Sequence, residues 1–162
     1  MRQYAERYYK FLMTIDWDDD LYVEGLKEGK TKFLSNMMVN SKKGSRHLYG
    51  DYYTHASLEK VRNRDFTGLV FEHIVPKTKY IIKPCEERAK NGTLTVDFIE
   101  DLLNRYYKVA VVTVEEDKKL NRNSMPPDWD GVNIFGRYEE AKIELIEKNL
   151  LTNDFEYVRL DS

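Results

Sequence analysis

Apolar residues recur at helical spacing through the first forty positions of the chain. Five of them fall on one face of a predicted helix: Tyr4, Tyr8, Phe11, Leu12 and Ile15. The same period returns over residues 21–40, and the aspartates of residues 16–20 lie between the two stretches. These aspartates lack the spacing of a calcium loop and suit a turn that caps the next helix. The pattern therefore predicts two helices joined by an aspartate-rich turn.

Three other segments have the pattern of strands. Residues 68–71 and 109–112 are short apolar runs, and the second is rich in β-branched valine, as is typical of a buried strand. Residues 155–160 alternate between apolar and polar and predict an edge strand. Together these runs predict a small β-sheet.

The rest of the chain is predicted to be mostly helical. Four stretches have helical character, at residues 77–90, 95–106, 115–121 and 138–149. Pro84 is expected to break or restart the first of them, and Thr95 to cap the second. Residues 41–57 are polar and aromatic and predict a loop or short hairpin, with Ser57 capping a short helix through Arg62. The fold class expected is α+β, a helix-dominated single domain over residues 1–162 with a small β-sheet.

Composition limits the class of protein. At 162 residues, 41% hydrophobic and 33% charged, the chain is long and apolar enough for one folded domain and is not a disordered chain. Its single cysteine, Cys85, excludes an internal disulfide and favours a reducing, cytoplasmic setting. The charged start lacks the apolar core of a signal peptide, and no run approaches the length of a membrane span. We expect a cytoplasmic protein without membrane contact.

The formal net charge of -2 conceals an asymmetry along the chain. Residues 1–90 hold 17 Lys+Arg against 13 Asp+Glu, whereas residues 91–162 hold 9 against 15. The first part is therefore at +4 and the second at -6. A basic segment can meet phosphates, while an acidic one repels them. Chance variation of surface charge would also produce such a difference, and this alternative stays open.

The most informative stretch is Leu-Val-Phe-Glu-His-Ile-Val-Pro, residues 69–76. Residues 108–120 add a second apolar run, then a threonine and a short charged segment. Together they resemble the HNH, or ββα-metal, family of endonucleases, over about residues 69–120. On this alignment Lys108 stands at the family's asparagine and Asp117 at its last histidine. A Glu-His pair at a strand end also suits a purely structural pair, which remains the alternative.

The resemblance implies a chemistry for four residues. Phosphodiester cleavage needs a base for the attacking water and a cation that stabilises charge on the phosphate. The resemblance makes His73 the catalytic base, and it makes Glu72 and Asp117 ligands of a Mg²⁺ or Mn²⁺ ion. Lys108 would neutralise a phosphate at the catalytic site. DNA or RNA would be the partner.

Basic and aromatic residues alternate near this stretch. Lysine and arginine contact phosphates and tyrosine stacks on bases, so these residues are candidates for binding nucleic acid. The candidates are Lys42, Lys43, Arg46, Tyr49, Tyr52, Tyr53, Lys77 and Lys79. A structural role for the tyrosines stays open.

Two functions from different classes remain at this point. The first is an HNH-like nucleic-acid-binding protein that acts as a metal-dependent endonuclease if its site is active. The second is a non-enzymatic interaction protein that inhibits or regulates a protein partner. Its contact surface would be formed by the Tyr-rich loop, residues 41–57, and the acidic C-terminal part, residues 91–162. The small size and mixed composition suit a phage or mobile-element protein in either case.

Overall fold

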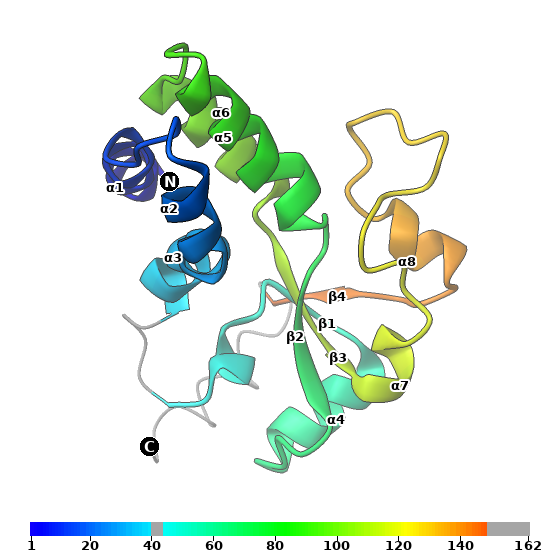
Figure 1. The fold of residues 1–162 in the computed structure, drawn as a ribbon. Helices are drawn as coiled ribbons and strands as arrows, with labels where there is room; N and C mark the ends of the chain where they lie inside the picture. The colour runs from blue at the N-terminus through cyan, green and yellow to red at the C-terminus, as the bar shows by residue number, and fades with distance from the viewer. Residues whose placement is uncertain (40–43, 149–162) are drawn as a thin grey trace. The chain divides into compact units, whose positions relative to one another are not determined.

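The computed structural model describes residues 1–39 and 44–148, and its elements confirm an α+β fold dominated by helices with a small mixed sheet (Figure 1). The chain divides into two compact units, each built from two separate segments. Unit 1 comprises residues 1–42 and 77–107, and unit 2 comprises residues 43–76 and 108–162. The single domain over residues 1–162 stays a prediction. No helix within the described ranges is both long and apolar enough to cross a membrane.

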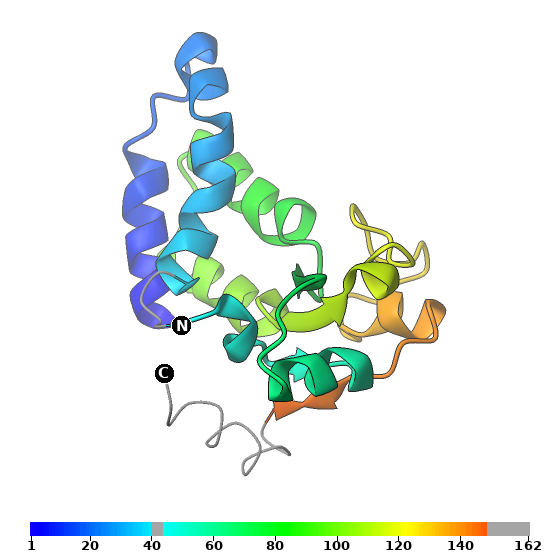
Figure 2. The same ribbon diagram turned by 90° about the horizontal axis from the view of Figure 1, so that it is seen from below.

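Unit 1 is helical. Its elements are α1 (Arg2–Met13), α2 (Asp20–Gly25), α3 (Lys27–Val39), the π-helical turn η2 (Thr78–Ile82), α5 (Lys83–Lys90) and α6 (Val96–Tyr106). Helix α1 packs against α6 and α3 (Figure 2). The predicted stripe on α1 is its inner face, where Tyr8 and Leu12 are fully buried. The helix predicted over residues 21–40 is two helices, with Leu26 between them.

Two capping predictions in unit 1 are confirmed. The Asp19 carboxylate accepts a hydrogen bond from the Tyr22 amide at the start of α2. The Thr95 hydroxyl accepts one from the Phe98 amide at the start of α6. Both satisfy amides that have no partner inside the helix. The restart predicted at Pro84 is also confirmed, because α5 begins at Lys83 directly after η2 and places Pro84 in its first turn.

Cys85 lies on the buried side of α5 and is fully inaccessible. Burial raises the pKa of its thiol to about 12, because the thiolate would lose its hydration. We expect Ellman's reagent at pH 8 to react with Cys85 at least about 100-fold more slowly than with a free thiol, since the thiolate is the reactive form. Stopped-flow measurements with and without urea test this expectation. Rapid reaction in the absence of urea would contradict the buried position of Cys85.

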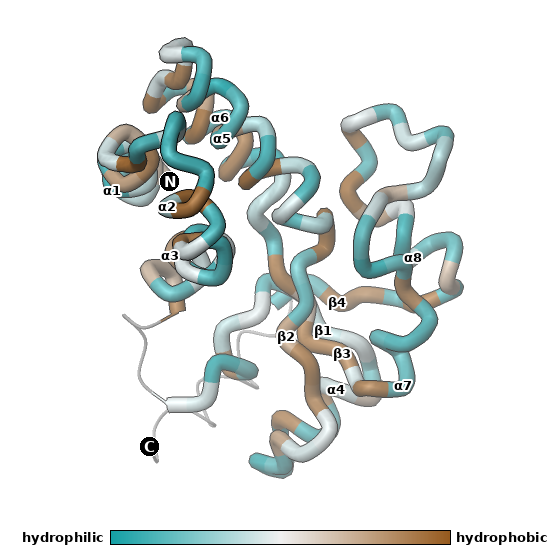
Figure 3. Tube along the Cα trace, in the orientation of Figure 1, coloured by the Kyte–Doolittle hydropathy of each residue, from teal (hydrophilic) through white to brown (hydrophobic). Residues whose placement is uncertain are grey.

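Unit 2 is built on a four-stranded sheet in the order β2-β3-β1-β4. The strands are β1 (Tyr52–Tyr53), β2 (Leu69–His73), β3 (Val109–Thr113) and β4 (Ile146–Glu147). Strand β3 is antiparallel to β2 and parallel to β1, while β1 and β4 are antiparallel. The strands predicted at residues 68–71 and 109–112 are confirmed as β2 and β3, and Figure 3 shows their hydrophobic character. The strand predicted over residues 155–160 lies outside the described residues.

Alternation along β3 divides the core of unit 2 between the two faces of the sheet. On one face Val111 joins Tyr53, Leu58 and Val61, which come from β1 and the helix α4 (His55–Arg62). On the other face Ala110 and Val112 join Leu120 and Tyr138. The second face lies beneath α7 (Val114–Asp117) and α8 (Gly136–Glu140). This second face carries the candidate site.

Three local predictions in unit 2 need correction. The segment predicted as a loop or hairpin contains a 3-10 turn, η1 (Arg46–Tyr49), followed by β1. Thr54, not Ser57, is the N-cap of α4, and Ser57 completes its capping box. The helix predicted over residues 138–149 is wrong in its extent, because α8 ends at Glu140. Lys142 then adopts a left-handed φ of 54°, and Ile146 and Glu147 pair with β1 instead.

Candidate active site

The two halves of the predicted motif lie side by side in unit 2. Strands β2 and β3 pair along their full length, from Leu69 opposite Thr113 to His73 opposite Val109. Helix α7 follows β3 directly, because Thr113 is its N-cap and forms a capping box with Glu116. Segments separated by 35 residues in the sequence therefore form one antiparallel pair that leads into a short helix (Figure 1).

Glu72 and Asp117 belong to the same side of the sheet. Glu72 lies opposite Ala110, whose side chain is on the face covered by α7 and α8. Asp117 ends α7 and is only 4% exposed. Burial raises the pKa of the Glu72 carboxyl; the Arg137 guanidinium opposes the rise, and the nearby Asp117 charge adds to it. The two predicted metal ligands therefore lie close enough for their charges to repel each other.

Arg137 is the central cation of this face, and its side chain is fully buried. It extends from α8 to the end of β2, where its guanidinium donates hydrogen bonds to the carbonyl groups of His73 and Ile74. Its Nη2 also donates to Glu72 Oε1 at 3.1 Å, and its Nη1 donates to the Asn121 carbonyl at 2.6 Å. One side chain thus joins α8, β2 and the segment after α7.

Two further polar groups complete this face. The Arg122 guanidinium forms an ion pair with Asp117 while its own side chain stays 65% exposed. The Tyr138 hydroxyl is buried and has no hydrogen-bond partner within the described residues. Burial raises the pKa of Tyr138, and the Glu72 charge adds to the rise. We call Glu72, Asp117, Arg122, Arg137 and Tyr138 the carboxylate–arginine cluster.

The predicted catalytic base does not join this cluster. His73 follows Glu72 in a regularly paired strand, and successive side chains of a strand point to opposite faces. Lys108 precedes β3, and its carbonyl accepts a hydrogen bond from the Ile74 amide, which continues the pairing beyond His73. The structure therefore brings together the two predicted ligands but not the base with them.

The residues predicted to bind nucleic acid are distributed over several environments. Tyr53 is fully buried, and its hydroxyl donates to the His47 carbonyl and accepts from the Gly50 amide, so stacking on a base is excluded for it. Tyr52 is half-buried, with its ring edge against Phe135. Lys42 and Lys43 lie outside the described residues.

The other four candidates differ in their availability. Arg46 is exposed on η1 and Tyr49 is half-buried there. Lys77 belongs to unit 1, where its ammonium donates to the Thr31 carbonyl and the Ser35 hydroxyl, and burial lowers its pKa. Lys79 is exposed in unit 1. Of the predicted set, Arg46 is exposed on unit 2, and Tyr49 and Tyr52 are half-buried there.

The donor set of the cluster suits a hard cation in part. No group of three or more His, Cys, Asp or Glu side chains in residues 1–39 and 44–148 is arranged to hold a metal ion. Mg²⁺ sites, however, often use one or two carboxylates and complete the shell with water and substrate phosphate. The hydrogen bonds to Arg137 and Arg122 use Oε1 of Glu72 and Oδ2 of Asp117. Neither hydrogen bond uses Oε2 of Glu72 or Oδ1 of Asp117.

Sequence reasoning missed the arginines of the cluster. Arg137 directly precedes the helix predicted over residues 138–149, and its partners lie 16 to 65 positions away along the chain. The one feature of the sequence that points to a buried Arg137 is its place among apolar neighbours, between Phe135 and Tyr138. Such a position indicates burial but names no partner.

Comparison with known proteins adds no relative. The chain matches no protein-family model, no curated protein and no solved structure. The function is therefore inferred from the residues of the site and their geometry.

Proposed function

We propose that unit 2 is an HNH-like nucleic-acid-binding domain and a divalent-metal-dependent endonuclease. The observation that carries the proposal is the pair of carboxylates, Glu72 and Asp117, on one face of an antiparallel strand pair that leads into a helix. A divalent cation between them would relieve their repulsion and also attract a phosphate.

Each residue of the site would have a distinct role in cleavage. Glu72 and Asp117 would hold Mg²⁺ or Mn²⁺, which as a Lewis acid stabilises charge on the phosphate. Arg137 keeps Glu72 and the end of β2 in place through its hydrogen bonds. Arg122 is exposed enough to turn from Asp117 to a phosphate oxygen. Lys108 remains the residue proposed to neutralise a phosphate of the nucleic acid.

His73 has no part in the proposed chemistry at the metal, because its side chain leaves β2 on the face opposite Glu72 and a general base must reach the attacking water. His73→Ala should therefore leave the cleavage rate nearly unchanged. A loss of about 10²- to 10⁴-fold, the usual contribution of a general base, would show that His73 does act as the base.

The decisive assay is nicking of supercoiled plasmid, with single-stranded DNA and RNA as further substrates. We expect cleavage with Mg²⁺ or Mn²⁺, none with EDTA, and losses of at least about 100-fold in Glu72→Gln and Asp117→Asn, since each removes a ligand charge. Glu115→Gln is the matched control, because Glu115 is an exposed carboxylate on α7. No cleavage of any substrate by the wild type, or equal cleavage by Glu72→Gln, would refute the proposal.

A further inference from the structure

A pocket on unit 2 is not used by the proposed nuclease chemistry. It has a volume of about 540 Å³ and lies where β1 meets the segment after α8. Its aromatic walls are Tyr52, Phe135 and Tyr138, and its charged residues are Glu139, Lys142 and Glu144. The Tyr-rich segment and the acidic C-terminal part, far apart in sequence, thus line one pocket.

The two outer rings stand at a steep angle to each other. The centroids of Tyr52 and Phe135 are 5.2 Å apart and their planes meet at 77°. Rings set in this way present both edges and faces to a ligand, and the face of an aromatic ring attracts cations. The pocket is therefore suited to a cation attached to an apolar stem.

The surrounding charge is acidic. Burial raises the pKa of the Tyr52 hydroxyl, and the charges of Glu147 and Asp51 raise it further, which indicates a negative potential beside this ring. A second pocket of about 400 Å³ shares Glu139 and adds the carboxylates of Asp128, Asp130 and Glu140 around Trp129. No lysine or arginine lines this second pocket. A phosphate would be repelled at both pockets, whereas a cation would be attracted.

We propose that these two adjoining pockets bind a basic peptide segment of a protein partner, with an arginine or lysine side chain in each. The aliphatic stem of such a side chain would contact Ile143 and Leu145, and its charged end would meet Glu139 or Glu144. An extended peptide places every second side chain on one face, about 7 Å apart, so two pockets joined at Glu139 suit basic residues separated by one position. The inference does not depend on nuclease activity.

The probe is a fluorescein-labelled octapeptide with four arginines, and its neutral counterpart carries citrulline in their place. Fluorescence anisotropy with the full chain should show salt-dependent binding of the arginine peptide, at least about tenfold tighter than the citrulline peptide. Equal affinity for the two peptides, or no binding of the arginine peptide up to millimolar concentration, would overturn the proposal.

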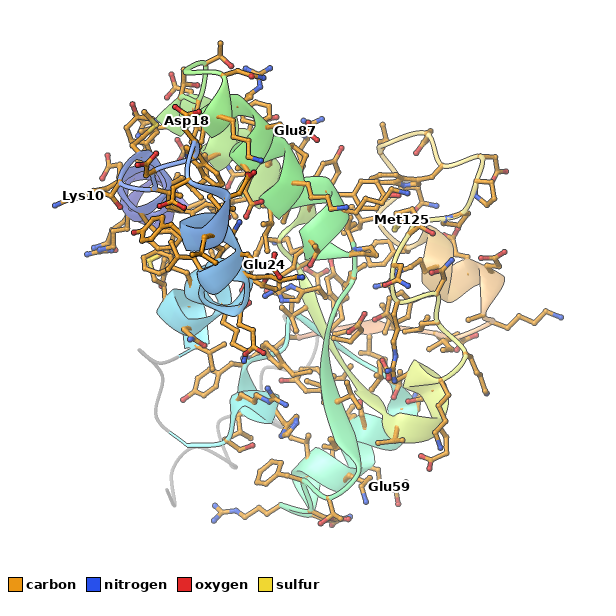
Figure 4. All side chains as sticks on the ribbon, viewed as in Figure 1. Lys10, Asp18, Glu24, Glu59, Glu87 and Met125 are labelled. Atoms are coloured by element: carbon orange, nitrogen blue, oxygen red, sulfur yellow. The ribbon has the colours of Figure 1, made fainter. Side chains whose placement is uncertain are left out.

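Matched variants separate a specific pocket from general charge. Glu139→Gln/Glu144→Gln should weaken the arginine peptide about tenfold, because two carboxylates of the pocket are lost. Glu59→Gln/Glu115→Gln removes the same charge from exposed sites on α4 and α7 (Glu59 is labelled in Figure 4) and should change the affinity less than about twofold. An equal loss in both double variants would show nonspecific attraction only and refute the pocket.

Two further measurements define the ligand. Tyr52→Leu keeps every charge and removes one ring, and it should weaken the arginine peptide about fivefold through the lost cation–π contact. Arginine amide alone should compete only at concentrations well above those of the peptide. Competition at equal concentrations would replace the peptide by a small cation, and unchanged affinity of Tyr52→Leu would remove the aromatic walls from the site.

Discussion

Replacing Arg137 with methionine is expected to lower the free energy of unfolding of unit 2 by about 3–5 kcal/mol, because it removes one partner of a buried charge pair. The guanidinium is fully buried and donates to carbonyl groups of His73, Ile74 and Asn121 as well as to Glu72. Methionine fills a similar volume but removes the hydrogen bonds that Arg137 donates to these acceptors. Urea unfolding followed by Trp129 fluorescence in a Trp17→Phe background measures the change in unit 2, since the chain has only two tryptophans.

Companion variants identify the cause of this loss. Arg137→Lys keeps the charge but not the forked geometry, and we expect it to cost about 2 kcal/mol. Arg62→Met alters an exposed arginine at the end of α4 and should change stability by less than about 0.5 kcal/mol. A loss below about 1 kcal/mol in Arg137→Met would mean that this side chain does not hold β2 to α8.

The Arg137→Met variant should also change its stability with pH. Arg137 opposes the rise that burial gives the pKa of Glu72, so that pKa should rise further in the variant. A carboxyl whose folded pKa is raised favours the folded state at low pH, and this contribution is lost as pH rises through the folded pKa. The destabilisation should therefore be smaller at pH 5 than at pH 8.

Elements with strong local signals were predictable from the sequence. Strand β3 is a continuous apolar run rich in β-branched valine, and α6 begins at a threonine cap followed by a clear apolar period. Both signals lie within a few residues and need no tertiary partner. The extent of α8 was not predictable in this way, because residues 138–149 have an apolar period. Ile146 and Glu147 instead form a strand, because they pair with Tyr53 and Tyr52 in the sheet.

The candidate site was predictable only in part, for a similar reason. The Glu-His pair at the end of an apolar run and the carboxylates after Thr113 are local patterns, and they led to Glu72 and Asp117. The arginines that bind these carboxylates are set by tertiary packing, since Arg137 lies 65 positions from Glu72. Strand pairing likewise decides that Glu72 and His73 face opposite ways, which a two-letter motif cannot express.

Substitutions at Asp117 and Arg122 should change the affinity for Mn²⁺ in opposite directions. Asp117→Asn removes one ligand charge and should weaken binding at least about tenfold. Arg122→Ala removes a cation that competes for Asp117, and it should tighten binding about fivefold, corresponding to about 1 kcal/mol for an exposed charge near the ion. Arg62→Ala removes an exposed arginine from α4 and is the matched control, with no expected change. Isothermal titration calorimetry measures all three without relying on cleavage.

The pH dependence of Mn²⁺ binding provides an independent test of the same site. A protonated carboxyl cannot bind the ion, and burial raises the pKa of Glu72 above its ordinary range. The affinity for Mn²⁺ should therefore increase as pH rises through this raised pKa. An exposed glutamate is already deprotonated at a lower pH, so a site made of exposed carboxylates would show this increase at lower pH. Glu72→Gln should lose this step as well as affinity, whereas Arg122→Ala should keep it. A pH-independent affinity in the wild type, or weaker binding in Arg122→Ala, would place any bound ion away from Glu72 and Asp117.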